Sequence, residues 1–484
     1  MSARRIRSSS PVEGLVRGRL SFAQVLGQSV SAVAPSAAMV TVPVLILPAA
    51  ADVTWVLVVI AAALMTGVGY CISQFATRMV AVSGVYSYTV KGLGAILGFA
   101  GGWSLLIGYA GAAMASVLGA GAYLTALLGR LGLPEGPGIV AGSAVLVGAL
   151  ALALMVRGVQ LSARISLAVE VFAIAAASAV LVVAFVTAVR SGAGPATDGP
   201  ARGSPGALGF WLLLAVTSFV GFESAGAVAR EARHPFVTVP RAIRWSPVVL
   251  GALYVFSAVM LQPEGVRSGL DALPVVLTLP EAGGLSTVLS VVMELGITAS
   301  WFACVIGSVT ALSRTLFAMG REGVVAPVFG RAHTRFATPH VALCAAMPLV
   351  VVVPVVYLLL AGSTREVLVG LLAVSAHGYV VAYILVCAAT PVFLHRIGEA
   401  TRGPTVVGVV TAALMVALVA SAAALGVPVA GAATAVYAGL LVVGAVALLV
   451  RWRREPDLRE RIGVYDEAVA GDLLAGYQPW RVRR

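Results

Sequence analysis

The chain has 484 residues, of which 60% are hydrophobic and only 11% are charged, and its mean hydropathy is +1.00. Soluble domains carry about 25% charged residues, so this composition argues against a water-soluble enzyme or binding module. The net charge of +12 requires no nucleic-acid partner, because the basic residues are spread over short segments between apolar runs and form no patch on a soluble fold.

Twelve apolar runs are long enough to cross a hydrocarbon core about 30 Å thick, which takes roughly 20 residues of helix. In chain order the predicted spans are 22–49, 53–75, 95–128, 139–156, 165–189, 207–229, 243–261, 285–312, 341–360, 367–390, 406–425 and 429–450. An all-α integral membrane protein is therefore predicted.

The first and the sixth predicted spans are interrupted near their midpoints. The first contains Pro35, which lacks an N–H and clashes with the carbonyl four residues before it. The sixth contains Gly221, which lowers helix propensity. Lipid offers no partner for a freed backbone group, so such a break persists only inside protein or beside a wet cavity. A matched pair of broken helices is typical of the central site of a membrane carrier.

The two breaks are five spans apart, which predicts a five-plus-five repeat. An odd number of spans in each repeat inverts the second copy relative to the first. The predicted organisation is a cytoplasmic segment at 1–20, a first repeat at 21–190, a second repeat at 205–392, two further spans within 403–452 and a cytoplasmic tail at 453–484.

The basic residues predict the orientation of the chain. If the N-terminus is inside, the inner segments hold nearly all of the 32 Lys and Arg residues, as the positive-inside rule requires. The exceptions are Arg130, Arg190, Arg202, Arg267 and Arg365. A multi-pass protein of the plasma (inner) membrane with both termini in the cytoplasm is therefore predicted.

All four cysteines fall within predicted spans, and none forms a CxxC pair. They are expected to be small buried apolar residues and neither disulfides nor metal ligands. No metal site and no cofactor is predicted.

Three groups of motifs identify a family. The sixth span and its exit contain Phe219-Val220-Gly221-Phe222-Glu223, Arg230-Glu231, Pro235 and Pro240-Arg241-Ala242-Ile243. The second span is followed by Ser83-Gly84-Val85-Tyr86-Ser87-Tyr88, Gly98-Phe99 and Gly102-Trp103. The eighth span ends with Met319-Gly320-Arg321-Glu322-Gly323 and Pro327. From about Leu26 to Thr390 the chain resembles the amino acid–polyamine–organocation (APC) superfamily of permeases, of the bacterial amino acid permease type.

The resemblance implies a secondary active transporter that moves amino acids or related amines by alternating access, with a central site between spans one, three, six and eight. Its partners would be a small-molecule substrate, the lipid bilayer and a coupling ion, H⁺ or Na⁺. An exchanger of amino acid and amine pairs is an alternative. A multi-span membrane enzyme is less favoured, because the short loops contain no His/Cys cluster.

The two breaks supply the expected substrate contacts. The N-terminus of a half-helix presents unpaired N–H groups and a positive dipole end, which suit a carboxylate. Freed carbonyls of the sixth span suit an ammonium group. The predicted substrate-binding residues are Ser31, Ala34, Pro35 and Ser36 at the first break, and Ser218, Phe219, Gly221 and Phe222 at the second.

Glu223 is the predicted proton-carrying or gating residue. A charge inside the membrane costs at least ~2.5 kcal/mol and usually marks function, although a structural Glu hydrogen-bonded to a neighbouring helix is the plainer alternative. Na⁺ could instead be held by oxygen ligands from Ser308, Thr310 and Ser313, unless these hydroxyls only bond carbonyls of their own helix.

Two further acids lie in predicted spans. Glu170, in span five, is expected to pair with Arg164, whereas Glu294, in span eight, has no motif around it. Some members of the family carry a Lys in span five that substitutes for a sodium ion. The resemblance puts that position near Ala173, and span five contains no Lys.

Overall fold

The computed structural model describes residues 15, 18–50, 53–157, 159–192, 205–263, 284–424 and 428–463. These residues are almost entirely helical, and the one isolated β-bridge among them joins Leu20 to Ala232. They include eleven helical stretches that are long and apolar enough to cross a membrane, the first of which combines the two halves of a broken helix. The prediction of an all-α membrane protein is confirmed.

The helices of the first half begin with a broken span. They are α1 (Phe22–Val33), α2 (Pro35–Ala50), α3 (Thr54–Ala76), α4 (Val85–Leu93), α5 (Ala95–Gly129), α6 (Pro137–Arg157) and α7 (Val159–Arg190).

The second half also begins with a broken span and then follows the same order of long helices. Its elements are α8 (Pro205–Val216), η2 (Phe222–Glu231), α9 (Pro235–Met260), α11 (Gly284–Glu322), η3 (Pro327–Gly330), α12 (His340–Ala361) and α13 (Thr364–Arg396). The chain continues with α14 (Arg402–Ala424), α15 (Pro428–Arg454) and α16 (Leu458–Arg461). This order is the one that a five-plus-five repeat requires, whereas the exact domain boundaries stay a prediction.

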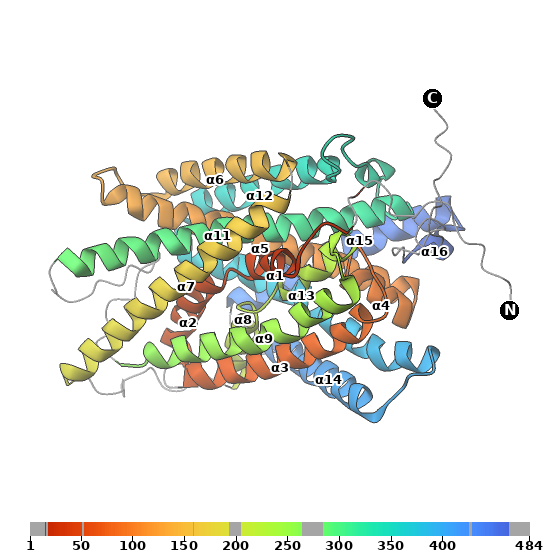
Figure 1. Cartoon of the computed structure of the whole chain (residues 1–484), viewed down its shortest axis with the longest axis horizontal. Coiled ribbons are helices and arrows are strands. Elements are labelled where there is room, and N and C mark those ends of the chain that lie inside the picture. Colours follow the sequence, from red (N-terminus) through yellow and green to blue (C-terminus); the bar gives the residue numbers. More distant parts are fainter. Residues whose placement is uncertain are drawn as a thin grey trace.

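The long helices run roughly along the longest axis of the molecule, with α6 and α12 at one edge and α3 and α14 at the other (Figure 1). The central helix α5 packs against both α11 and α13, and α3 packs against α9. Small residues allow these close approaches. A Cβ added to Gly378 of α13 would lie 2.5 Å from the backbone nitrogen of Gly108 of α5. On the outer helices, large apolar side chains such as Leu146, Leu349 and Val443 are exposed, as lipid contact requires.

The eighth span is longer than its apolar run. The run predicts 285–312, but α11 continues to Glu322. Hydropathy ends the span early because the last part of the helix contains Arg314 and Glu322, which are both buried. Their charges are paired or hydrogen-bonded within the protein, so the helix extends beyond the part that the apolar pattern identifies.

Candidate functional site

The first break falls at a single residue. Ala34 adopts the left-handed conformation (φ 53°), and its N–H donates to the carbonyl of Val30 at 3.1 Å, which ends α1. The next helix begins at Pro35, where the missing N–H removes no helical hydrogen bond. The predicted residues Ser31, Ala34, Pro35 and Ser36 are all buried around this point.

The second break is a turn between α8 and η2. Gly221 adopts φ 104°, a conformation that favours glycine. A Cβ on Gly221 would lie 2.5 Å from the carbonyl oxygen of Ala32, so the two breaks touch through their backbones. The structure therefore brings together the predicted residues of both breaks, and Ser218, Phe219 and Phe222 are buried there.

Side chains tie α1 to η2 and to α11. The Ser29 hydroxyl donates to the Phe222 carbonyl at 2.7 Å, and the Ser224 hydroxyl donates to the Gln28 carbonyl at 3.2 Å. The Gln28 amide nitrogen donates to the Gly307 carbonyl at 3.0 Å. These bonds hold α1 against η2 and α11, and one of them satisfies the Phe222 carbonyl at the second break inside the protein, as a lipid environment requires.

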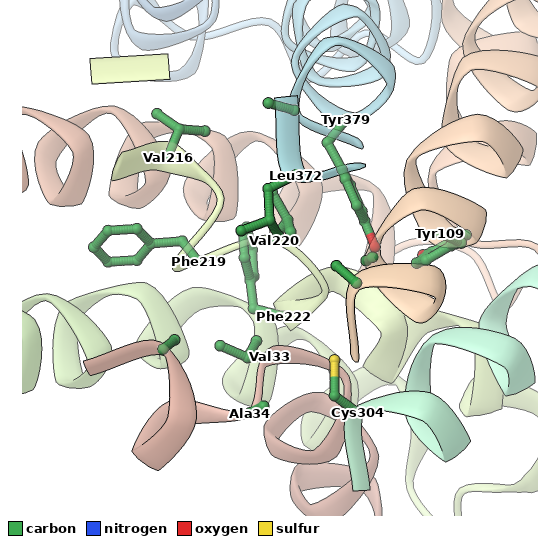
Figure 2. Close-up of a cluster of buried hydrophobic side chains, with 14 of the residues drawn as sticks. Val33, Ala34, Tyr109, Val216, Phe219, Val220, Phe222, Cys304, Leu372 and Tyr379 are labelled. Atoms are coloured by element: carbon green, nitrogen blue, oxygen red, sulfur yellow. The ribbon is translucent and has the colours of Figure 1, made fainter. Parts of the chain in front are cut away.

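An apolar cluster lies between the two breaks. Figure 2 shows Val33 and Ala34 of the first break facing Phe222 of the second, with Tyr109 and Tyr379 on the far side. The labelled members of this cluster are Val33, Ala34, Tyr109, Val216, Phe219, Val220, Phe222, Cys304, Leu372 and Tyr379. Its side chains come from the first and sixth spans and from α5, α11 and α13, so the centre of the bundle is apolar where the predicted substrate contacts converge.

Glu223 joins the second break to two other helices. Its Oε1 accepts from the Tyr109 hydroxyl of α5 at 2.8 Å, and its Oε2 accepts from the Tyr383 hydroxyl of α13 at 2.6 Å. Oε2 also accepts from the Gly221 N–H at 3.1 Å. Both oxygens of this buried carboxylate are therefore occupied by donors. The sequence left two interpretations of Glu223, a proton-carrying or gating residue and a structural residue hydrogen-bonded to neighbouring helices. The hydrogen bonds of the second interpretation are present.

We expect Tyr383→Phe to lower stability by about 1.5–3 kcal/mol, because it removes a hydrogen bond to a charged acceptor. The expected readout is a lower midpoint of thermal unfolding for the purified protein. Tyr357→Phe, at a half-buried position on α12, is the matched control. An unchanged midpoint for Tyr383→Phe would show that its hydroxyl does not support Glu223.

Glu170 occupies the N-terminus of α2. The Ser36 N–H donates to Glu170 Oε1 at 2.6 Å, and the Ser300 hydroxyl donates to the same oxygen at 3.0 Å. The expected partner, Arg164, has its side chain outside the described part of the structure. The acid within span five is visible in the sequence, but no spacing rule links it to the first break.

The region of span five that carries a Lys in some family members is closely packed. A Cβ on Gly296 of α11 would lie 2.9 Å from the Ala173 Cβ. The short side chains at both positions allow α7 and α11 to approach, and a lysine at position 173 would require them to separate.

The three hydroxyls predicted as a cation site do not share one location. The Ser308 hydroxyl lies 3.6 Å from the Cys304 sulfur. Thr310 and Ser313 instead line a small pocket with Thr338 of the segment before α12. The Ser313 hydroxyl donates to the Thr310 carbonyl at 2.9 Å. It thus bonds a carbonyl of its own helix, which was the alternative to a cation site for this residue.

A buried ion pair lies toward the end of the bundle that carries α16. Arg314 of α11 donates to both carboxylate oxygens of Glu231 at 2.8 and 3.0 Å and to the Ala227 carbonyl at 2.8 Å. Arg314 lies near this end because α11 ends at Glu322, whose carboxylate accepts from the N–H of Gly463, just after α16, at 2.9 Å.

A second ion pair lies near the other end of α11. Arg130, just after α5, donates through Nε and Nη2 to Glu294 at 2.9 and 2.5 Å. The hydrogen bond to Glu294 raises the pKa of the Arg130 guanidinium, which keeps it charged. A rise of 1.5 Å per helical residue places Glu294 and Arg314 about 30 Å apart. Cys304, between them on α11, donates to the Ala32 carbonyl at 3.2 Å, so the breaks meet α11 between the two ion pairs.

Two broken helices that meet at a buried centre, with an ion pair toward each end, define a membrane carrier of the broken-helix type. Residues 25–449 match the family model described as "Amino acid permease", and the chain belongs to this family. The family and the fold agree with a transporter and not with an enzyme.

Three curated relatives match the chain over similar lengths. The branched-chain amino acid permease BcaP of Lactococcus lactis subsp. cremoris is 30% identical over 292 residues, which are 57% of this chain and 62% of that protein. BcaP of Bacillus subtilis is 26% identical, over 56% of this chain and 60% of that protein. The methylthioribose transporter of Bacillus subtilis is 25% identical, over 56% and 60%. The match thus covers less than two thirds of each relative.

Proposed function

We propose that this permease is a secondary active transporter of neutral aliphatic amino acids that works by alternating access and is coupled to protons. The observation that carries the choice of substrate is the apolar cluster between the two breaks. Glu223, beside this cluster, already has donors on both oxygens. An aliphatic side chain suits contact with such apolar side chains. The names of the two BcaP relatives support branched-chain amino acids in particular.

In the proposed binding mode the amino acid lies between the two breaks. Its carboxylate binds the N-terminus of α2 at Ser36, where the dipole is positive, close to Ser31, Ala34 and Pro35. Its ammonium group binds the carbonyls of the turn from Ser218 to Gly221. Its side chain packs against Phe219 and Phe222 and the rest of the apolar cluster.

We propose that the ion pairs along α11 and the carboxylate of Glu223 act as gates. The pair of Arg314 with Glu231 closes the cytoplasmic side, and the pair of Arg130 with Glu294 closes the outer side. Glu223 links the second break to α5 and α13, so a movement of the break changes its hydrogen bonds to these helices. A sodium site that uses Ser308, Thr310 or Ser313 is the alternative form of coupling, and it would require these hydroxyls to rearrange.

The test is uptake by the purified protein in liposomes. Radiolabelled leucine, isoleucine and valine should be taken up with saturation and should compete with one another, whereas lysine and methylthioribose should compete weakly. An inward proton gradient without sodium should drive accumulation. Transport only in the presence of an internal amino acid would favour the exchanger, and a failure of every amino acid to compete would contradict the proposed function.

We also propose that both termini are cytoplasmic, and labelling of single cysteines tests this topology. In a background without native cysteines, Leu131→Cys, at a residue 79% exposed after α5, should react with an impermeant reagent added to intact cells. Ser9→Cys and Glu467→Cys should react only after the cells are opened. Labelling of either terminal cysteine in intact cells would overturn the orientation.

A further inference from the structure

The N-terminus of α2 already holds a carboxylate that belongs to the protein. Pro35 has no N–H, and the first available donor, the Ser36 N–H, is bound to Glu170 at 2.6 Å. The next donor, the Ala37 N–H, is 3.4 Å from the Ser300 hydroxyl, which itself donates to Glu170. A substrate carboxylate can therefore reach Ser36 only if Glu170 leaves it.

Half of the Glu170 carboxylate has no donor. Its Oε2, the Ser36 hydroxyl and the Tyr254 hydroxyl are buried and have no hydrogen-bond partner among the described residues. Glu223 differs in this respect, because both of its oxygens accept hydrogen bonds. An unsatisfied carboxylate oxygen in a buried site favours binding of a proton, so Glu170 is better suited than Glu223 to change its protonation state.

The groups that face Glu170 supply no positive charge at hydrogen-bonding distance within the described structure. Tyr254 of α9 and Cys304 of α11 are the titratable side chains that interact with it electrostatically. The helices α1 and α2 contain no titratable residue, and α6 contains only its terminal Arg157. On α11, Glu294 and Arg314 are engaged in their own ion pairs.

Space for a displaced Glu170 side chain lies directly beside it. A groove of about 400 Å³ between α1, α7 and α9 is lined by Glu170, Pro35, Leu250 and Leu253, with Arg241 of α9 at its wall. Almost all of its lining is apolar, so the neutral acid can enter it at a much lower desolvation cost than the carboxylate. Protonation thus favours movement of the side chain away from the N-terminus of α2.

We propose that Glu170 and the substrate carboxylate compete for the N-terminus of α2, so that an amino acid binds there together with one proton. This inference rests on the proposed amino acid transport. The ionised Glu170 binds the Ser36 N–H in the empty carrier. A proton from the outer solution converts Glu170 to the neutral acid, which releases Ser36 to the substrate. When the substrate leaves on the other side, the proton passes to water and the carboxylate returns.

Because binding takes up a proton in this scheme, substrate affinity rises as the pH falls. The Kd of wild-type protein for leucine should tighten by up to about tenfold for each unit of pH lost, over the range in which Glu170 of the empty carrier is ionised. In a weakly buffered detergent solution with a pH indicator, addition of leucine should remove one proton from solution for each leucine bound.

The matched variants are Glu170→Gln, which is neutral at every pH, and Glu135→Gln, which removes an exposed acid after α5. Glu170→Gln should bind leucine with a Kd independent of pH, take up no proton on binding and lose accumulation driven by a proton gradient. Glu135→Gln should keep the pH dependence of the wild type. Glu170→Asp, which restores the carboxylate, should recover part of it.

Two results would overturn the inference while leaving the proposed amino acid transport intact. One is wild-type leucine exchange with a Kd that does not change with pH and no proton uptake on binding. The other is a Glu170→Gln variant that still accumulates leucine under a proton gradient. If Glu170→Gln fails to fold, the proton count on the wild type decides alone. Absence of amino acid exchange by the wild type would instead refute the proposed function, and this inference with it.

Discussion

Gly221→Ala and Gly307→Ala are each expected to abolish leucine uptake, because both glycines pack directly against the backbone near the end of α1. A Cβ at 221 would lie 2.5 Å from the Ala32 carbonyl oxygen, and a Cβ at 307 would lie 2.5 Å from the Ala32 nitrogen. Overpacking of this kind costs about 1–3 kcal/mol, and the φ of 104° at Gly221 adds backbone strain for any other residue. The two substitutions should push the first break away from the second.

The control for these variants is Gly439→Ala in α15, where an added Cβ would meet no atom within 4 Å. Its uptake should equal that of the wild type. The amount of each variant in the membrane is measured alongside uptake, so that loss of transport is separated from loss of protein. Wild-type kinetics in Gly221→Ala would contradict the contact between the two breaks.

Arg314→Met is expected to give the largest loss of stability of any single change on α11. It would leave the Glu231 carboxylate buried without its partner, and breaking a buried pair in this way costs about 3–5 kcal/mol. The side chains of Arg314 and Glu231 are only 3% and 9% exposed, so water cannot compensate. We expect a much lower midpoint of thermal unfolding and little or no uptake.

Two further variants test the cause of that loss. Arg314→Met combined with Glu231→Gln should recover part of the midpoint, because no unpaired charge then remains. Arg78→Met removes the pair with Glu399, which is 56% exposed, and should cost at most about 1 kcal/mol. Equal effects of Arg314→Met and Arg78→Met would show that the buried pair stabilises the protein no more than an exposed one.

The sequence was sufficient to predict the membrane helices and the two breaks, because long apolar runs and single helix-breaking residues can be recognised locally. Apolar runs predict membrane helices one by one, and Pro35 and Gly221 mark both breaks without any knowledge of the tertiary structure. Two predicted spans are clearly too short: the span at α9 begins at residue 243 although the helix begins at Pro235, and the span at α11 ends at residue 312 although the helix ends at Glu322. The error at α11 arose because Arg314 and Glu322 interrupt the apolar pattern while their partners lie elsewhere in the chain.

The contacts within the candidate site were less accessible to sequence reasoning. Glu170 reaches Ser36 across 134 residues of chain, and no periodicity within span five indicates which helix it faces. Thr310 and Ser313 are close to Ser308 in sequence, but the turn of the helix directs them to a different neighbour. The neighbours of each side chain therefore became known only from the packing of the helices. The residue types alone were enough to suggest the chemistry of the site.

An electron cryomicroscopy structure of the wild-type protein in lipid nanodiscs at saturating leucine would show where the substrate binds and whether Glu170 moves. We expect density for one leucine between residues 31–36 and 218–221, with its carboxylate on the Ser36 N–H and the Glu170 side chain displaced. Leucine bound elsewhere in the bundle, or bound while Glu170 still accepts the hydrogen bond from Ser36, would contradict this expectation.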